Sequence, residues 1–329
     1  MKAVIVTEPG KPEVLQIQER DIPRPQAHEV LIKVTASGIN RPDIIQRKGF
    51  YPAPKDAPAD IPGLEVSGII SALGPEVKNF ELGDEVCALI SGGGYAEYVC
   101  APSAQCLPVP DGVSLIDAAS LPETFFTVWN NVFDIAHFKN GETVLVHGGS
   151  SGIGVTAIQM IKAMGGKVYV TAGTWEKCSF CESLGTEKAI NYKEEDFEER
   201  ILECTNQKGV DIILDMIGGA YASQNLSLLR PQGRLVLINA MKGKIAEIDL
   251  LQVMKKQLTI TGSTLRPQSI EYKGKIAKNL LIHIWPLIGE KIHPVIYKTF
   301  PLHRAAEAHA LMESSQHMGK ILLQIPTEV

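Results

Sequence analysis

Apolar and polar positions alternate over short distances in the first third of the chain. Runs rich in β-branched residues are separated by turns such as Pro62-Gly63 and Gly74-Pro75. Strands at this spacing, bounded by glycine and proline, are typical of an all-β barrel or sandwich. The pattern therefore predicts a β-lobe with strands at Ala3–Thr7, Val30–Thr35, Val66–Ala72, Val86–Ile90 and Ala96–Cys100, interrupted by one short helix at Arg41–Lys48.

The pattern changes near residue 113. Apolar residues recur at helical spacing from Ser114 to about His137, and strands then alternate with helices. This alternation is the signature of βαβ units in a parallel, doubly wound sheet. The predicted strands are Thr143–His147, Lys167–Thr171, Lys188–Asn191, Val210–Asp215, Arg234–Asn239 and Leu258–Ser263, and the predicted helices between them are Ile153–Met164, Trp175–Leu184, Glu195–Cys204 and Ala220–Leu229.

The end of the chain resembles neither pattern alone. We expect a helix at about Ile270–Ile288, a strand at Val295–Thr299, a helix at His303–Glu313 and a last strand at Lys320–Ile325. A chain that begins as a β-lobe, becomes α/β and ends in a strand indicates an inserted nucleotide-binding domain. The expected division is a β-lobe at 1–122, a nucleotide-binding domain at 123–264 and a return segment at 265–329 that completes the β-lobe.

Composition excludes several classes of protein. Hydrophobic residues make up 45% of the 329 positions and charged residues 21%, which is enough apolar material for a core. The formal net charge is −5 and no Lys/Arg block occurs, so nucleic acid and membrane are not expected partners. Six irregularly spaced cysteines and an N-terminus without the apolar core of a signal peptide favour a reducing, cytoplasmic setting.

The most specific local signal is a glycine-rich turn between the strand that ends at His147 and the next helix. Its glycines are Gly148, Gly149, Gly152 and Gly154. Small residues let the backbone approach a diphosphate, and the N–H groups of the helix start bind that anion. The spacing differs from GxGxxG, and a tight turn without a ligand is the alternative. Within a complete βαβ series, dinucleotide binding is the better explanation.

The second strand indicates which dinucleotide is bound. NAD sites place an acidic residue at the tip of this strand, about 20 residues after the glycine turn. Here the strand ends at Gly173-Thr174, Lys177 follows in the next helix, and Tyr192 follows the third strand. A cation and a hydroxyl suit a 2′-phosphate, since a charge-assisted hydrogen bond contributes about 1.5–3 kcal/mol. Unless both are ordinary surface residues, NADPH is favoured over NADH.

Several segments carry a resemblance that covers essentially the whole chain. They are ASGINRPDIIQRKGFY, PGLEVSGII, VLVHGGSSGIG, TAGTWEK, INYKEEDF, ILDMIGG, GSTLR and GKILL. In this order they resemble the zinc-independent quinone oxidoreductases of the medium-chain dehydrogenase/reductase superfamily, and most of all the stress-induced NADPH:quinone oxidoreductase branch, in which a serine stands where Ser151 does. The resemblance implies an α/β protein with a GroES-like β-barrel catalytic lobe and a Rossmann domain. It also implies a homodimer, which an unpaired last sheet strand would favour.

The resemblance also assigns site residues. Tyr51 and Asn40 would lie at the substrate and nicotinamide, Tyr51 as a wall and hydroxyl donor and Asn40 as a neutral, orienting donor. Asp43 and Arg266 are further candidates, although a carboxylate at a helix start is the alternative for Asp43. The cofactor would contact Ser151, Gly152, Ile153 and Gly154 at its diphosphate, Gly173, Lys177 and Tyr192 at its 2′-phosphate, and Thr127, Asn239 and Leu265 at its nicotinamide end.

No metal site is expected. The positions that match the catalytic zinc ligands of the related alcohol dehydrogenases hold Asn40 and Leu64, and the four clustered cysteines of their structural zinc are missing. Zn²⁺ needs about four N, S or O ligands. The pair Cys178 and Cys181 has no second pair beside it. Three C-terminal histidines are expected on a solvated face: His303, His309 and His317.

The expected activity is an NADPH:quinone reductase that transfers hydride, without a metal, from nicotinamide C4 to a quinone stacked in an interdomain cleft. A quinone is already an electrophile, so the protein has to supply a dry slot and hydrogen-bond donors. Two alternatives remain open. One is NADPH-dependent reduction of activated C=C bonds in enals or enones, and the other is a non-catalytic NADPH-binding protein.

Overall fold

The computed structural model describes residues 1–55 and 57–326. The chain divides into two compact units, here called unit 1 (Met1–Phe126 with Arg266–Val329) and unit 2 (Thr127–Leu265). The units divide after Phe126 and Leu265, whereas the sequence predicts domain boundaries after residues 122 and 264. Among the helices of the described residues, none combines the length and the apolar character needed to span a membrane.

Unit 2 contains a six-stranded parallel sheet. Its strand order is β10-β9-β8-β11-β12-β13, which is the doubly wound order 3-2-1-4-5-6 when the strands are numbered from β8. The carboxyl ends of β8 and β11 therefore mark the point where the order reverses, which is where such sheets bind ligands. The strands are β8 (Thr143–His147), β9 (Lys167–Ala172), β10 (Lys188–Asn191), β11 (Val210–Asp215), β12 (Leu229–Leu237) and β13 (Thr259–Gly262).

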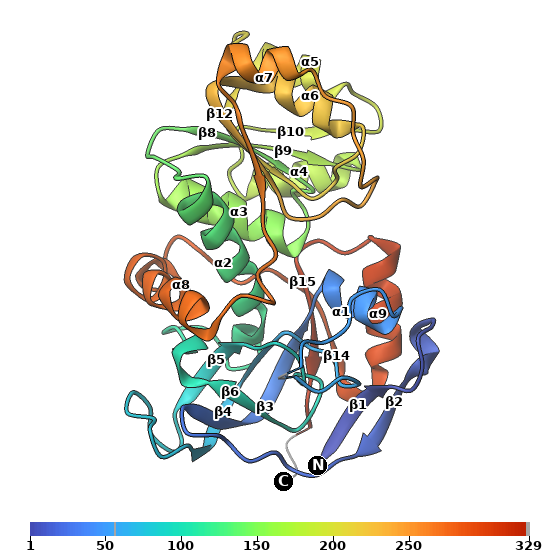
Figure 1. The fold of residues 1–329 in the computed structure, drawn as a ribbon, viewed down its shortest axis with the longest axis vertical. Coiled ribbons are helices and arrows are strands. Elements are labelled where there is room, and N and C mark those ends of the chain that lie inside the picture. Colours follow the sequence, from blue (N-terminus) through green and yellow to red (C-terminus); the bar gives the residue numbers. More distant parts are fainter. Residues whose placement is uncertain (56, 327–329) are drawn as a thin grey trace. The chain divides into compact units, whose positions relative to one another are not determined.

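Helices cover both faces of this sheet (Figure 1). One face carries α3 (Gly152–Ala163) and α4 (Trp175–Ser183), and the other carries α5 (Phe197–Cys204), α6 (Tyr221–Leu228) and α7 (Leu250–Lys256). The sequence analysis missed α7, because its apolar residues Leu250 and Met254 are exposed and no buried face marks it. The signal that was present is Asp249, whose side chain accepts hydrogen bonds from the backbone of the first turn.

The central strand of unit 1 is β3 (Glu29–Ile39). One edge of β3 pairs with β4 (Glu65–Leu73), while the other edge pairs first with β6 (Tyr98–Pro102) and then with β15 (Lys320–Gln324). The last strand therefore returns to the first lobe, as expected. The sheet also contains β5 (Glu85–Leu89), β7 (Cys106–Pro108) and β14 (Ile296–Pro301), whereas β1 (Lys2–Val6) and β2 (Leu15–Glu19) form a separate pair.

Several features outside the six-stranded sheet differ from the expectation. The strands β2 and β7 were not predicted, and the pairings among the described strands do not record a closed barrel, so the barrel stays a prediction. The helix expected over Ser114–His137 is a 3₁₀ turn (Asp117–Ser120), α2 (Pro122–Val128) and a π-helix (Trp129–Ile135). The helix expected to reach Ile288 ends earlier, as α8 (Ile270–His283), because Pro286 disfavours helical backbone at the residue before it.

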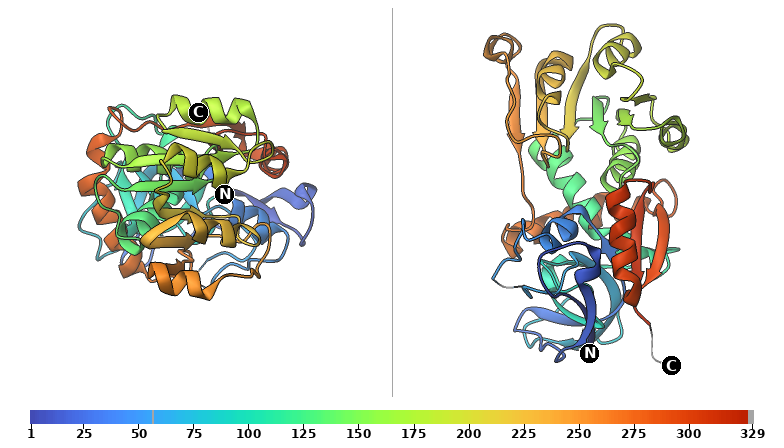
Figure 2. Two further views of the ribbon diagram at one scale, coloured as in Figure 1. Left: turned by 90° about the horizontal axis from the view of Figure 1, so that it is seen from above. Right: turned by 90° about the vertical axis from the view of Figure 1, so that its right-hand side faces the viewer.

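The expected solvated C-terminal face is wrong for two of its three histidines. In α9 (Ala305–Ser314), which lies beside β14 and β15 in Figure 2, His309 is fully buried, and His317 is 7% exposed; only His303 is exposed. His309 shares the buried helical face of Ala305, Ala308 and Met312. These positions follow the i, i+3, i+4, i+7 spacing of a core-facing helix, so the spacing could have placed His309 inside.

Candidate active site and cofactor cradle

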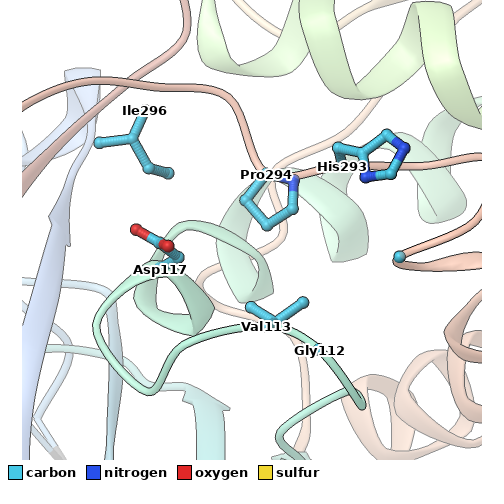
Figure 3. A pocket seen from close by; sticks show the side chains of 7 residues that line it. Gly112, Val113, Asp117, His293, Pro294 and Ile296 are labelled. Atoms are coloured by element: carbon cyan, nitrogen blue, oxygen red, sulfur yellow. The ribbon is translucent and has the colours of Figure 1, made fainter.

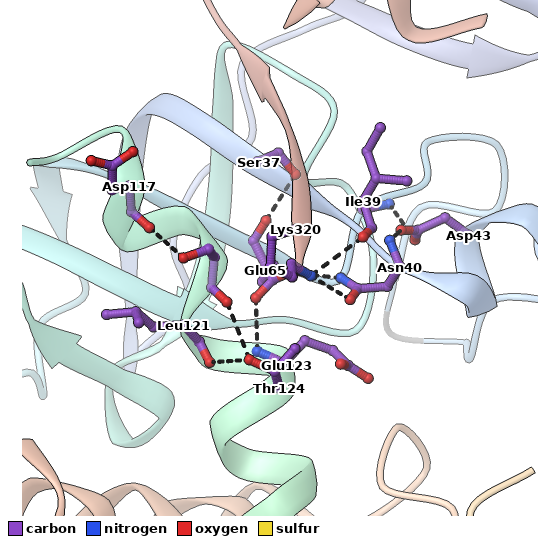
Figure 4. Close-up of polar contacts among 12 residues, drawn as sticks. Ser37, Ile39, Asn40, Asp43, Glu65, Asp117, Leu121, Glu123, Thr124 and Lys320 are labelled. Atoms are coloured by element: carbon purple, nitrogen blue, oxygen red, sulfur yellow. Dashed lines mark hydrogen bonds and ion pairs between the residues drawn. The ribbon is translucent and has the colours of Figure 1, made fainter. Parts of the chain in front are cut away.

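Asn40 lies at the point where β3 ends and α1 (Arg41–Arg47) begins. It is 6% exposed, and its amide group bonds two charged side chains of unit 1 (Figure 4). Its Oδ1 accepts a hydrogen bond from Lys320 Nζ over 2.6 Å, and its Nδ2 donates to Glu65 Oε1 over 2.7 Å. The structure thus places Asn40 among buried polar groups, with its amide orientation defined.

Glu65 and Lys320 form a buried ion pair beside Asn40. The distance between Lys320 Nζ and Glu65 Oε1 is 2.5 Å, and the two side chains are 4% and 0% exposed for Lys320 and Glu65 respectively. The other oxygen, Oε2 of Glu65, accepts the backbone N–H of Glu123 in the first turn of α2 over 2.8 Å. Neither residue is among those predicted from the sequence, although Glu65 directly follows Leu64, which stands at the position of a metal ligand in the related alcohol dehydrogenases.

Asp43 is buried in the first turn of α1 and accepts three hydrogen bonds. Its Oδ2 accepts from the backbone N–H of Asn40 over 2.8 Å and from the hydroxyl of Tyr95 over 3.2 Å. Its Oδ1 accepts from the backbone N–H of Gly63 over 3.1 Å. Burial raises the pKa of Asp43 to about 6, although the backbone N–H groups of Asn40 and Gly63 act in the opposite direction. The carboxylate therefore ties the chain after β3 to the chain before β4.

A chain of polar side chains continues behind Asp43. The Tyr95 hydroxyl lies 3.0 Å from His309 Nε2, and His309 Nδ1 lies 3.3 Å from Arg47 Nη1. Arg47 in turn donates to Glu313, which is partly exposed, over 2.8 Å. These contacts link the surface of α9 to the buried carboxylate next to Asn40.

Tyr51 belongs to a different group of contacts. Its ring lies 5.2 Å from the guanidinium carbon of Arg266, a cation–π arrangement. Arg266 is held by the carbonyl of Ser91 and the side chain of Gln46, each at 2.8 Å. Burial raises the pKa of Tyr51, so its hydroxyl stays protonated at neutral pH and can donate. Tyr51 is therefore in contact with Arg266, whereas Asn40 is hydrogen-bonded to Asp43.

In unit 2 the glycine-rich turn leads directly into α3. Ser151 is the residue before the helix, and its Oγ accepts the backbone N–H of Gly154 over 3.0 Å. A Cβ at Gly154 would lie 2.3 Å from the carbonyl oxygen of Gly149, so only glycine allows the turn to close this tightly. Gly152 and Ile153 form the first turn, whose N–H groups suit a diphosphate. The turn thus fits the cofactor group expected there.

Two of the three residues expected at the 2′-phosphate, Gly173 and Tyr192, lie close together. A Cβ at Gly173 would lie 3.0 Å from the hydroxyl of Tyr192 and 3.5 Å from Cε of Lys193. Burial lowers the pKa of Lys177, and the nearby ammonium of Lys193 lowers it further. Cys181 and Glu176 act on the Lys177 pKa in the opposite direction, and a bound phosphate would do so as well, because an anion favours the charged form of a lysine. Lys193 was missed by the sequence analysis, although it directly follows Tyr192.

The residues expected at the nicotinamide end are linked in part. The carbonyl of Thr127 accepts from Asn131 Nδ2, and Asn131 Oδ1 accepts from the hydroxyl of Ser263, each over 2.8 Å. This connects Thr127 to the segment that leads into Leu265. Asn239 follows β12, and its Oδ1 accepts the N–H of Ala240. Asn131 and Ser263 are thus two further residues that the local pattern did not reveal.

Two family models match the chain in succession. The "Alcohol dehydrogenase GroES-like domain" matches residues 26–111, and the "Zinc-binding dehydrogenase" model matches residues 152–278. The quinone oxidoreductase of Rattus norvegicus is 36% identical over 98% of this chain and 97% of its own length. The chain belongs to the quinone oxidoreductase family of the medium-chain dehydrogenases/reductases. The predicted α/β architecture with GroES-like and Rossmann-like domains is confirmed, and the protein is an oxidoreductase.

Solved structures of this superfamily share the fold. The Escherichia coli quinone oxidoreductase complexed with NADPH has a TM-score of 0.86 and 28% identity, covering 98% of this chain and 100% of that one. The CurK enoyl reductase has a TM-score of 0.87 and 29% identity, covering 99% of each chain. The NADPH in the Escherichia coli structure supports a nicotinamide cofactor for this member of the family.

The zinc that one family model names does not fit the side chains of this quinone oxidoreductase family member. A catalytic zinc needs anionic or neutral N, S or O ligands. Here the ammonium of Lys320 lies 2.6 Å from Asn40 Oδ1, and the neighbouring candidate position is the buried Leu64. Among the described residues, no three His, Cys, Asp or Glu side chains form a possible metal site. Cys178 and Cys181 are buried free thiols on α4.

A shallow hollow of about 390 Å³ lies elsewhere on unit 1 (Figure 3). It is lined by two glycines and by the apolar side chains of Val113, Pro294 and Ile296, with Asp117 and His293 as its polar side chains. It contains none of Asn40, Tyr51 or Asp43. The hollow is therefore separate from the candidate active site of this quinone oxidoreductase family member.

Proposed function

We propose that the protein is an NADPH-dependent quinone reductase that works without a metal. The observation that carries this proposal is the buried arrangement of Asn40, Glu65 and Lys320. Asn40 matches a zinc-ligand position of the related alcohol dehydrogenases, and here its Oδ1 accepts a hydrogen bond from the ammonium of Lys320. A quinone needs no Lewis acid, because it is already an electrophile. Hydrogen-bond donors directed at the oxygen that gains charge are sufficient.

NADPH is the proposed cofactor. When bound, it supplies the hydride. Ser151, Gly152, Ile153 and Gly154 would hold its diphosphate at the start of α3. Gly173, Lys177 and Tyr192, with Lys193, would surround its 2′-phosphate, while Thr127, Asn239 and Leu265 would approach the nicotinamide.

Tyr51 and Asn40 are the proposed catalytic residues. The half-buried ring of Tyr51, with Arg266 on its face, would form a wall for the quinone ring, and its protonated hydroxyl would donate to a quinone oxygen. Asn40 would donate through its amide. Asp43 would hold the backbone of Asn40 through the hydrogen bond from its N–H.

Reduction of an activated C=C bond is the second candidate. The similarity to CurK enoyl reductase supports it. Both activities need the same cofactor and differ in the acceptor. Quinone reduction is the first choice because the whole-length relatives carry that name.

The experiment that tests the proposal is steady-state oxidation of NADPH and NADH after exhaustive chelation. The acceptors are one ortho-quinone, one para-quinone and one enone. We expect quinone turnover that favours NADPH and is the same before and after chelation. Turnover of the enone alone would establish the second candidate, and loss of activity on chelation would show that a metal takes part.

We further propose a homodimer that pairs through β13. This strand is the last in its sheet, bonds only β12 among the described strands, and carries Ile260 at 39% exposure. Such an edge can pair with a second copy. Ile260→Lys would place a charge on that edge. Sedimentation should then show a dimer for the unmodified protein and a monomer for the variant; a monomer in both cases would overturn the proposal.

A further inference from the structure

Two buried charges allow the Asn40 amide only one orientation. Oδ1 faces the ammonium of Lys320 over 2.6 Å, and Nδ2 faces Glu65 Oε1 over 2.7 Å. An ammonium only donates hydrogen bonds and an ionised carboxylate only accepts them. Turning the amide by half a turn would bring nitrogen against nitrogen and oxygen against oxygen. The two charges therefore decide which amide atom faces which way.

The same contacts decide what the amide can offer to a ligand. A side-chain amide has two N–H groups and two oxygen lone pairs. Among the described residues, Glu65 takes one N–H and Lys320 takes one lone pair. The second N–H of Nδ2 is left as a donor in a fixed direction.

We propose that Glu65 and Lys320 are positioning residues that act through Asn40, by holding its second N–H towards the substrate oxygen that gains charge. This inference rests on the proposed function, in which Asn40 touches that substrate. It adds two residues, far apart in the sequence, that touch neither substrate nor cofactor.

The surroundings show that the carboxylate is built into the fold. Burying a pair of charges is costly, and an apolar pair of similar volume is often as stable, so stability alone does not account for Glu65 and Lys320. A Cβ at Gly38 would lie 2.1 Å from Glu65 Oε1 and 2.8 Å from the carbonyl oxygen of Ala119, so glycine at this position makes room for the carboxylate. The backbone N–H of Glu123 holds its other oxygen.

The first test is a mutant cycle measured on the whole protein. The double variant Glu65→Gln/Lys320→Met removes both charges together, so neither is left buried alone. We expect its kcat to fall about tenfold or more, since small misplacements of a reacting group are costly. In the Asn40→Ala background the same double change should alter kcat by less than about twofold, because sites that act through one group are not additive. Losses that multiply in the two backgrounds would overturn the inference.

The controls separate this effect from a general loss of structure. Glu271→Gln/Lys275→Met neutralises an exposed ion pair on α8 and should leave kcat unchanged. Thermal unfolding and NADPH binding measure whether the site variant is folded.

The second test does not depend on turnover. The side-chain amide signal of Asn40 can be assigned by nuclear magnetic resonance, as the one lost in Asn40→Ala. We expect it to shift in Glu65→Gln/Lys320→Met without any substrate present. An unshifted signal would overturn the inference even if quinones are reduced. If neither quinone nor enone is reduced by the unmodified protein, the proposed function fails, and the amide signal still decides whether the two charges orient Asn40.

Discussion

Tyr95 donates its hydroxyl hydrogen to Asp43, over 3.2 Å, because His309 on its other side can only be a donor. Arg47 Nη1 lies 3.3 Å from His309 Nδ1, and a guanidinium cannot accept a hydrogen bond. His309 Nδ1 is therefore the acceptor, the proton of the neutral ring is on Nε2, and Tyr95 accepts it. In this series of hydrogen bonds from Arg47 through His309 and Tyr95, Asp43 is therefore the final acceptor.

Protonation of Asp43 should lower activity in acid. Burial raises its pKa to about 6, while Arg266 and Lys320 pull it down, so the carboxylate is ionised at pH 7 and becomes neutral as the pH falls below about 6. A neutral carboxyl group accepts the hydrogen bonds from Asn40, Gly63 and Tyr95 less well than the ionised carboxylate does. We expect kcat/KM with NADPH and a quinone to fall on the acid side with a midpoint near pH 6.

The Asp43→Asn variant is the control for this prediction. The side chain at position 43 of this variant is neutral at every pH. The activity of the variant should therefore be low, and its kcat/KM should not show the fall near pH 6 (the acid limb of the pH profile). His309 cannot produce the limb, because burial and then the Arg47 charge lower its pKa to about 3. An acid limb of unchanged midpoint in Asp43→Asn would refute the assignment.

His309 should make the folded state less stable in acid. Its pKa is about 3 when folded and 6.5 when exposed, so between these values the unfolded chain binds a proton that the folded chain does not. Stability from this group is therefore lost as the pH falls through that window, by on the order of 2 kcal/mol between pH 7 and pH 5. Asp43, whose pKa is raised, acts in the opposite direction and offsets part of the loss.

Replacement of His309 isolates this effect. His309→Asn should be less stable than the unmodified protein at pH 7. The loss should be about 1–3 kcal/mol, because the buried side chains of Tyr95 and Arg47 lose their hydrogen-bond partner. The difference should shrink by on the order of 2 kcal/mol at pH 5, since the variant no longer has a histidine to keep neutral. Urea unfolding at both pH values measures this difference, and the same difference at both would contradict a neutral, buried His309.

Lys177 should determine the preference for NADPH. A charge-assisted hydrogen bond to the 2′-phosphate contributes about 1.5–3 kcal/mol, so Lys177→Ala should lower kcat/KM for NADPH about 10- to 150-fold. NADH lacks the phosphate, so its kcat/KM should change by less than about twofold. Lys193→Ala should act in the same direction.

Lys167→Ala serves as the control for the cofactor variants, since Lys167 begins β9, at the opposite end of that strand from Gly173. It should leave both cofactors unaffected. Steady-state kinetics with each cofactor measure the outcome. Equal losses with NADPH and NADH in Lys177→Ala would remove Lys177 from the phosphate site.

Some elements of the fold can be predicted from the sequence and others cannot. The bounds of β8, β10 and β11 were predicted as observed, because each is a short, apolar strand in a regular βαβ series. The residues of the glycine turn and of the expected phosphate site could be proposed for the same reason: they are local to strand ends. By contrast, α7 has no buried face, and β7 has only three residues, so neither has a pattern to detect.

Glu65 and Lys320 could not be found in this way. They are 255 positions apart and meet because β4 and β15 pair with opposite edges of β3. The return of the last strand was predicted, but the register that pairs Ile321 with Ile39 was not, and this register places Lys320 beside Asn40. A shift by one residue would turn the lysine to the other face of the sheet.

Tyr51 should act more through its ring than through its hydroxyl. Tyr51→Phe removes one hydrogen-bond donor, which is worth about 1 kcal/mol, so kcat/KM for the quinone should fall about fivefold. Tyr51→Ala removes the ring as well, together with its contact with Arg266 at 5.2 Å, and should cost on the order of 100-fold. NADPH binding, measured separately by fluorescence, should be the same in both variants, because the diphosphate and 2′-phosphate residues are in unit 2. If Phe and Ala at this position gave equal kcat/KM, the ring would not be a wall of the substrate site, and the hydroxyl alone would account for the role of Tyr51.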